Sequence, residues 1–456
     1  MQKTDTLSKK APSTRNILMF AIPSLLGLLF FMTPITFGDS VTIPIAVMAS
    51  TVLDLLGNSA TAVVTALVVL SAVVSVLVTL TKPAVITRHG FLNGLFNVTP
   101  IWLATRIFGA VFVIMAFYGI GTPVIMGETT GAFVLNELLP TLLSVFIFAG
   151  LLLPLLTSFG LLELLGAVFT KVMRPLFGLP GRSAVDCAAS WLGDGSVGIL
   201  MTSKQYEQGF YTQREAAVVG TTFSAVSISF SLVVIAQVNL MHMFTWFYLT
   251  VCLAGIAAAI VVPRLPPLCW KKDALIDNSE RQGDEETLPE GYSTLSYGLH
   301  CALNRAEKIR SVNSVLKEGA QNAVDMVLGV LPVVMAIGTA ALMVAEYTEV
   351  FSILGAPFVP LLELLHIPDA VKASETMVIG FADMFIPAIL AADIESEMTR
   401  FVIATVSVTQ LIYISEVGAL LLGSKIPVKL WELFVIFILR TLVTLPVVAG
   451  IAHLIF

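Results

Sequence analysis

Residues able to do chemistry are few in this chain, and the first group lies in apolar surroundings. The segment SWLGDGSVGILM, residues 190–201, places Asp194 between two glycines and just ahead of Ser196. An interrupted helix exposes unpaired backbone N–H and C=O groups, and glycines let that backbone approach a ligand closely. Asp194 could bind a coupling cation or a solute, or it could only cap the half-helix that follows. We predict that Gly193, Asp194, Gly195 and Ser196 contribute to a binding site.

A second candidate acid is Asp383, in the segment FADMFIPAIL, where Pro387 would break or start a helix. The spans that follow the two acidic segments carry polar stripes at helical spacing: Thr221, Ser224, Ser227 and Ser231, then Ser407, Gln410, Tyr413 and Glu416. Serine and threonine often serve only helix packing in membranes, whereas buried Gln and Glu are costly and indicate function. We predict that solute binding involves Asp383 together with Ser224, Ser227, Gln410, Tyr413 and Glu416.

One arginine, Arg440 in FVIFILRTLVTLP, lies close to the middle of a predicted span. A charge at that depth is costly unless it has a partner. Arg440 could pair with Glu416 or another acid, or it could bind an anionic solute, so it is also a candidate binding residue. The histidines and cysteines show no metal-ligand spacing, and we predict no metal site, disulfide framework or cofactor.

The elements that must position these residues are membrane helices. Of 456 residues, 57% are hydrophobic and only 12% are charged, against about 25% charged in soluble domains. Runs of about 20 apolar residues match the hydrocarbon thickness of a bilayer. We therefore predict an all-α polytopic membrane protein with about nine transmembrane helices. The expected spans are residues 17–37, 59–81, 98–120, 139–160, 216–240, 243–263, 323–345, 401–422 and 430–452.

Two further apolar segments, 184–203 and 373–392, are short and interrupted by Gly, Pro or Asp. Such segments are typical of re-entrant or broken helices. If neither crosses the membrane, Lys and Arg gather on one side and acids on the other. The positive-inside rule then places the N-terminus and the polar linker 264–315 in the cytoplasm.

The two halves of the chain resemble each other. The matched landmarks are Gly150 with Gly338, Pro180 with Pro368, and Asp194 with Asp383. Under the predicted topology the matching spans cross in opposite directions, which is the inverted repeat of many secondary transporters. We predict an N-terminal transmembrane region 1–135, a first repeat 136–263, the linker 264–315 and a second repeat 316–456.

Residues 135–240 resemble a Gate, or nucleoside recognition, domain. The resemblance rests on an apolar span, the amphipathic LLELLGAVFTKVMRPLFGLPG, a glycine-rich broken helix and a helix that opens at TQREA. Residues 320–425 resemble this domain more weakly, and the whole chain is similar to bacterial YjiH-type membrane proteins. Related Gate domains occur in concentrative nucleoside transporters, ferrous-iron transport proteins and spore maturation membrane proteins. The chain has no GxxxxGK[ST] phosphate loop, so a GTPase-driven iron transporter would lack its motor here.

The residues and the resemblance together predict a secondary transporter, or permease, of a small polar solute in the bacterial inner membrane. Coupling to H⁺ or Na⁺ would run through Asp194, Asp383 or Glu416. The alternative, from another class, is a Gate-domain scaffold or signalling component that moves no cargo. No HExxH, GxSxG or paired-acid motif indicates an enzyme, and no basic patch indicates nucleic acid. The expected partners are the lipid bilayer and one small solute, with a homo-oligomer or a small membrane partner left open.

Overall fold

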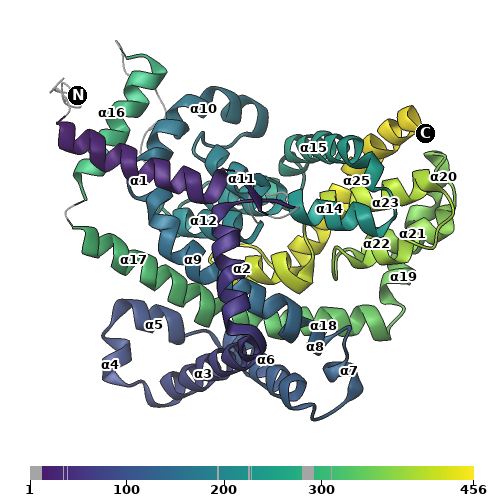
Figure 1. Cartoon of the computed structure of the whole chain (residues 1–456), viewed down its shortest axis with the longest axis horizontal. Coiled ribbons are helices and arrows are strands. Elements are labelled where there is room, and N and C mark those ends of the chain that lie inside the picture. Colours follow the sequence, from purple (N-terminus) through teal and green to yellow (C-terminus); the bar gives the residue numbers. More distant parts are fainter. Residues whose placement is uncertain are drawn as a thin grey trace.

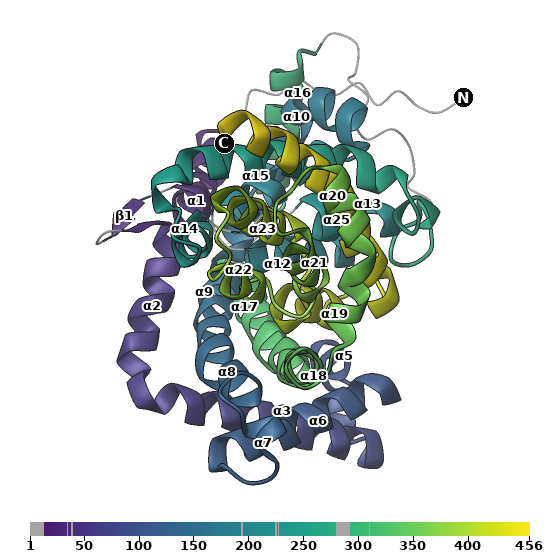
Figure 2. The ribbon, with the colours of Figure 1, turned by 90° about the vertical axis from the view of Figure 1, so that its right-hand side faces the viewer.

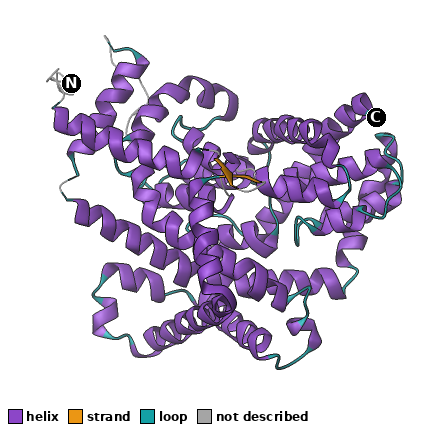
Figure 3. Cartoon of the chain, viewed as in Figure 1, coloured by secondary structure: helices purple, strands orange, loops and turns teal. Residues whose placement is uncertain are grey.

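The computed structural model describes residues 13–33, 35–37, 40–192, 195–223, 226, 228–279, 292–309 and 311–456. Helices form nearly all of the regular structure in these residues (Figure 3). One short hairpin pairs strand β1 (Ile35–Phe37) antiparallel with β2 (Ser40–Thr42), and Ile35 lies opposite Thr42. The predicted helical class is confirmed.

Eight helices in the described residues are long and apolar enough to cross a membrane, so the chain is a multi-pass membrane protein. They cover Thr14–Met32, Pro44–Thr81, Pro100–Tyr118, Pro123–Thr157, Met241–Arg264, Val312–Tyr347, Glu397–Gly423 and Leu430–Ile455.

The expected span over 216–240 is divided instead of continuous. Its first part is α13 (Gln213–Val218) with the π-helical η3 (Val219–Phe223), and its second part is α14 (Ile228–Gln237). The hydroxyls of Thr221 and Thr222 donate to the carbonyls of Ala217 and Val218, each at 2.6 Å. Both residues lie in the π-helical η3, and π-helical turns are a known cause of helix kinks, so the interruption begins at this segment.

The N-terminal region forms a layer against the rest of the molecule. Gly57 turns the chain between α2 (Pro44–Leu56) and α3 (Ala60–Thr81), and its φ of 47° lies in the left-handed region. α3 packs against α6 (Pro100–Tyr118), which packs in turn against α18 (Leu331–Tyr347). Figures 1 and 2 show α3 and α6 at the bottom of the molecule, and Figure 2 shows α2 rising from them along one flank.

The two halves repeat one order of elements. Each contains, ahead of its half-helices, a π-helical segment that runs into a proline-started helix: η2 (Val134–Leu138) into α9 (Leu139–Thr157), and η7 (Met326–Val330) into α18. Each continues with two half-helices: α11 (Ser183–Leu192) and α12 (Gly195–Glu207), or α21 (Ala370–Ile379) and α22 (Ile386–Ala391). Each ends with a long helix, α15 (Phe244–Val261) or α25 (Leu430–Ile455). This order is consistent with the predicted repeat, whose inversion stays a prediction.

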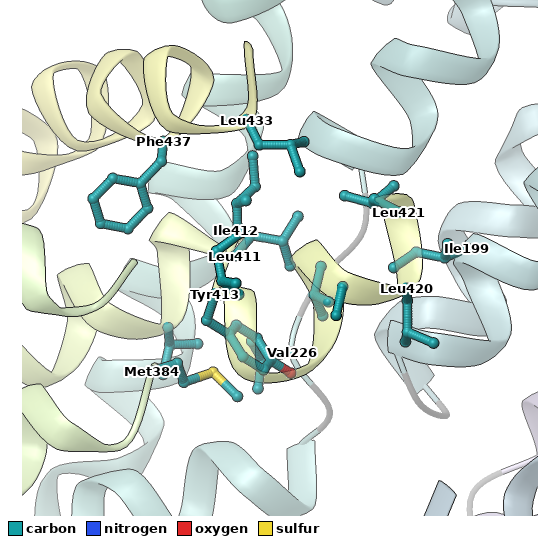
Figure 4. Packing of buried hydrophobic residues seen from close by; sticks show 14 of the residues in the cluster. Ile199, Val226, Met384, Leu411, Ile412, Tyr413, Leu420, Leu421, Leu433 and Phe437 are labelled. Atoms are coloured by element: carbon teal, nitrogen blue, oxygen red, sulfur yellow. The ribbon is translucent and has the colours of Figure 1, made fainter. Parts of the chain in front are cut away.

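The core of the second half surrounds α23 (Glu397–Gln410), which packs against both α15 and α25. Where α23 ends, Leu411 and Ile412 continue into the core and lie near Leu433 and Phe437 of α25 (Figure 4). All four side chains are almost fully buried. The end of α23 is therefore held in a packed apolar environment, which fixes the groups beside it.

The described part of the linker is packed against both halves. α16 (Thr294–Glu307) lies along the amphipathic α10 (Leu161–Phe177) of the first half. Gly298 permits this approach, because a Cβ there would lie 3.0 Å from the carbonyl oxygen of Leu164. Lys271 Nζ forms an ion pair with Glu432 Oε2 of α25 at 2.7 Å. The linker therefore connects the halves through side-chain contacts as well as through the chain.

Candidate solute-binding site

Two helix breaks of the second half meet. One separates α21 from α22, and the other separates α23 from the π-helical η9 (Ile414–Gly418). Leu411 has a φ of 66°, which ends α23. The N–H groups of Ile414 and Ser415 donate to the carbonyls of Phe381 and Ala382 at 2.7 and 2.9 Å. Backbone groups without helical partners at one break thus find partners at the other.

Asp383 lies at this junction and is 8% exposed. Its Oδ1 atom accepts from the Phe385 N–H at 2.8 Å, and its Oδ2 atom accepts from the Ser415 hydroxyl at 2.6 Å. Pro387 is the second residue of α22, so it starts that helix as its fixed φ favours. The sequence-predicted interruption is present, and the carboxylate bridges both of the breaks that meet here.

A cavity of about 680 Å³ opens beside Asp383, and Tyr413 and Glu416 line it too. The Tyr413 hydroxyl donates to Glu416 Oε2 at 3.3 Å, and Figure 4 shows the Tyr413 ring beside Met384. Further walls come from Glu137 and from Phe230 of α14. Cavities of about 300–1,000 Å³ accommodate small organic molecules. Three of the sequence-predicted residues, Asp383, Tyr413 and Glu416, therefore share one cavity.

Gln410, another predicted site residue, stands outside the described lining of this cavity. Its Nε2 atom donates to the Met377 carbonyl at 2.7 Å and to Thr441 Oγ1 at 2.9 Å, which fixes α21 against α25. Its Oε1 atom is buried beside Gly380 and has no hydrogen-bond partner among the described residues. The contacts of Gln410 are thus structural.

Arg440 joins helix ends from both halves. Its Nε and Nη2 atoms donate to the Thr409 carbonyl at 3.0 and 2.6 Å, and its Nη1 atom donates to the Thr222 carbonyl at 2.9 Å. Thr409 lies in the last turn of α23 and Thr222 lies in η3, where carbonyls lose their helical partners. Of the two roles expected for this arginine, pairing with Glu416 is not found in the described part of the chain, because its partners there are carbonyls.

The first half contains a buried carboxylate that the sequence analysis missed. Asp186 of α11 is 1% exposed, and its Oδ2 atom accepts from Thr202 Oγ1 and from the Tyr211 hydroxyl, each at 2.9 Å. Its Oδ1 atom accepts from Gln205 Nε2 at 2.5 Å. Because Thr202 and Gln205 belong to α12, this network holds the two half-helices together. The only sign of this network in the sequence is an isolated acid, Asp186, followed downstream by two polar residues, Thr202 and Gln205, that lie three positions apart.

The remaining predicted residues belong to the first half. Gly195 and Ser196 open α12, and Ser196 is buried. Neither stands among the described residues of the 680 Å³ cavity. The predictions for Gly193, Asp194, Ser224 and Ser227 concern positions outside the described residues.

Charged contacts lie near the start of α18. A cavity of about 150 Å³ lies there beside Val330 and Val333. The segment before η2 lies farther along the helix, with Gly131 close to Thr339 and Gly127 close to Tyr347. Lys204 Nζ of α12 forms ion pairs with Asp325 Oδ2 at 2.7 Å and with Glu207 Oε2 at 3.0 Å. These contacts tie the first half to the second on the side opposite the larger cavity.

Fold and site together define a multi-pass helical membrane protein with a Gate domain, because residues 139–241 match the Gate family, described as nucleoside recognition. The chain is 49% identical over 444 residues to Uncharacterized protein BpOF4_10220 of Alkalihalophilus pseudofirmus, a match that covers 97% of this chain and 96% of that protein. The chain therefore belongs to the same family as BpOF4_10220. Among solved structures, a doubly substituted CNTnw in an outward-facing state has 16% sequence identity and a TM-score of 0.34, covering 95% of this chain and 99% of that one.

Proposed function

We propose that this protein is a secondary transporter that moves a small polar solute across the bacterial cytoplasmic membrane, driven by H⁺ or Na⁺. The observation that carries the proposal is the 680 Å³ cavity at the meeting point of two interrupted helices. Interrupted helices offer backbone donors and acceptors to a solute within the membrane, where irregular backbone is otherwise too costly.

The difference between the two ends of α18, a cavity at one and an ion pair at the other, supports an alternating-access mechanism. On one side the cavity reaches Asp383, Tyr413 and Glu416. On the other side, which the charge pattern predicts to be cytoplasmic, the Lys204–Asp325 ion pair joins the two halves. In this proposal, release to that side would require the pair to separate, and the described conformation would be the one open toward the cell exterior.

The coupling cation would use the carboxylates of the cavity. Asp383 bridges both breaks, so occupancy of its oxygens by a proton or Na⁺ changes its hydrogen bonds to Ser415 and Phe385. By changing these hydrogen bonds, a bound ion would change the relative stability of the conformations of the two helix breaks. Glu416 in the same cavity and Asp194, the sequence-predicted counterpart of Asp383 in the first half, are the other candidates.

The test is uptake into proteoliposomes that contain the purified full-length chain. Radiolabelled uridine, choline, dialanine and succinate would be offered under an inward Na⁺ or H⁺ gradient. We expect wild type to accumulate one of them, and Asp383→Asn to lower its initial rate at least tenfold. Glu346→Gln, an exposed acid outside the described cavity lining, serves as the matched control.

The outcomes separate the candidate functions. Equal uptake by wild type and Asp383→Asn would reject the site. No accumulation of any solute by folded protein, together with stabilisation by a co-purified membrane partner, would favour the scaffold alternative.

A further inference from the structure

We infer that the solute is an organic cation, a small molecule with an ammonium group held in the 680 Å³ cavity. The inference rests on the proposed function for its transport step, but the binding it predicts can be measured without transport. It follows from the chemistry of the cavity walls, which combine carboxylates with aromatic rings.

The charged groups of the cavity are all of one sign. Four carboxylates line it, Glu128, Glu137, Asp383 and Glu416, and no lysine, arginine or histidine stands among its described lining residues. Glu128 and Glu137 are exposed, while Asp383 is buried and Glu416 is partly buried. The acids of the lining therefore range from exposed to buried. An anionic solute in this cavity would meet repulsion, and a cation would meet attraction that is strongest beside the buried acid, where the dielectric constant is lowest.

Aromatic side chains stand beside these acids. Phe133, Phe230, Phe385 and Tyr413 line the same cavity. The rings of Phe230 and Phe385 pack edge to face, with centroids 5.9 Å apart. The faces of such rings attract ammonium groups, and cages of this kind bind amines and quaternary ammonium ions in other proteins. An apolar wall with carboxylates beside it matches the two parts of an organic cation.

A bare metal ion fits these walls less well. Metal sites need several oxygens at about 2.0–2.6 Å from one point. In the part of the chain that the structure describes, no three His, Cys, Asp or Glu side chains converge in this way. Spread over a cavity of about 680 Å³, the four carboxylates instead suit a solute of several heavy atoms.

The experiment is thermal unfolding of the purified full-length protein with charged and uncharged isosteres. Choline is compared with 3,3-dimethylbutan-1-ol, which has the same shape without the charge, and n-butylammonium is compared with butan-1-ol. NaCl, MgCl₂ and uridine complete the panel. We expect at least one organic cation to raise the unfolding temperature in a saturable way and its neutral isostere to have no such effect. Glu416→Gln should weaken that binding at least tenfold, because Gln can still accept from Tyr413 but carries no charge. Glu346→Gln should leave it unchanged.

Each other outcome overturns the inference. An equal response to a cation and its neutral isostere would show that charge is not recognised. A response to uridine or to a metal ion alone, lost in Glu416→Gln, would keep the site and reject the organic cation. No response from cooperatively unfolding wild type would reject cation binding. Only the failure of transport leaves the binding inference standing: choline binding without uptake in proteoliposomes would reject the proposed transport and retain the cation site.

Discussion

Ser415 donates a 2.6 Å hydrogen bond to Asp383, and this bond joins two interrupted helices that lie 32 residues apart in the chain. Ser415→Ala removes a buried bond to a carboxylate, so we expect the free energy of unfolding to fall by about 1.5–3 kcal/mol. Thermal unfolding measures this loss. Ser407→Ala is the matched control, because that buried hydroxyl donates only to Ala404 within its own helix. Equal losses in both variants would contradict a special role for the Asp383 contact.

Arg440 should be a structural residue. Arg440→Met leaves the carbonyls of Thr409 and Thr222 without their donors, although it also removes a buried charge. We expect a net loss of about 2–3 kcal/mol and a lower yield of monodisperse protein in size-exclusion chromatography. The exposed Arg88→Met should change stability by less than about 0.5 kcal/mol. Unchanged stability in Arg440→Met, with loss of anion binding instead, would restore the solute-binding role expected from the sequence.

The network around Asp186 can be tested at one donor. Tyr211→Phe keeps the ring and removes the hydroxyl that donates to Asp186 at 2.9 Å. We expect a loss of about 1.5–3 kcal/mol in chemical or thermal unfolding, since the acceptor is a buried carboxylate. Tyr347→Phe, whose side chain is half exposed on α18, should be close to neutral. A neutral Tyr211→Phe would mean that Thr202 and Gln205 alone hold the carboxylate.

The Lys204–Asp325 pair should couple the two halves. In a double-mutant cycle of Lys204→Met and Asp325→Asn, we expect a coupling energy of about 1 kcal/mol, because both side chains keep some exposure. The pair Arg400–Glu397, 3.7 Å apart on one helix with Glu397 more than half exposed, should give about 0.3–0.5 kcal/mol. Uptake assays on the same variants report whether the pair also governs access. If the two substitutions have additive effects on the free energy of unfolding, the ion pair does not couple the two halves.

Gly150 of α9 lies where this helix packs closely against a neighbouring helix. A Cβ at this position would overlap the backbone of Ala323 in α17 (Val312–Asp325), so Gly150→Ala should destabilise by about 1–3 kcal/mol. Gly450 of α25 faces open space, and there the same change should be neutral or stabilising by up to about 1 kcal/mol. Comparing the two unfolding temperatures is sufficient. A tolerated Gly150→Ala would imply that α9 and α17 can separate.

The sequence predicted those residues of the candidate site whose own type or immediate neighbours indicate a role. Pro387 and the neighbouring acid marked the break at Asp383, and the larger polar side chains marked Tyr413 and Glu416. Gln410 and Arg440 were also recognised as special, but their contacts were not predicted, because these contacts go to backbone carbonyls and, for Gln410, to the Thr441 hydroxyl as well. Asp186 was missed for a related reason: its donors belong to α12 and to Tyr211, and only folding of the half-helix pair brings them together.

The division of the chain between α13 and α14 shows the same limit. Hydropathy reports how apolar a segment is, and residues 216–240 are apolar enough to span a bilayer. It does not report that Val219–Phe223 form a π-helical segment, a feature that commonly kinks helices. Contact with the Arg440 guanidinium then holds the distorted end, and that contact comes from a residue more than 200 positions away.

The Arg440 contact has a thermodynamic consequence. One side chain completes the hydrogen bonds of a helix end in each half, so unwinding or tightening one end changes the free energy of the other. Bonds to a charged donor of about 1.5–3 kcal/mol correspond to factors of about ten to a hundred or more in an equilibrium constant. Such linkage is reciprocal. Ligands that favour one arrangement at η3 and at the end of α23 should therefore bind cooperatively, each raising the affinity for the other.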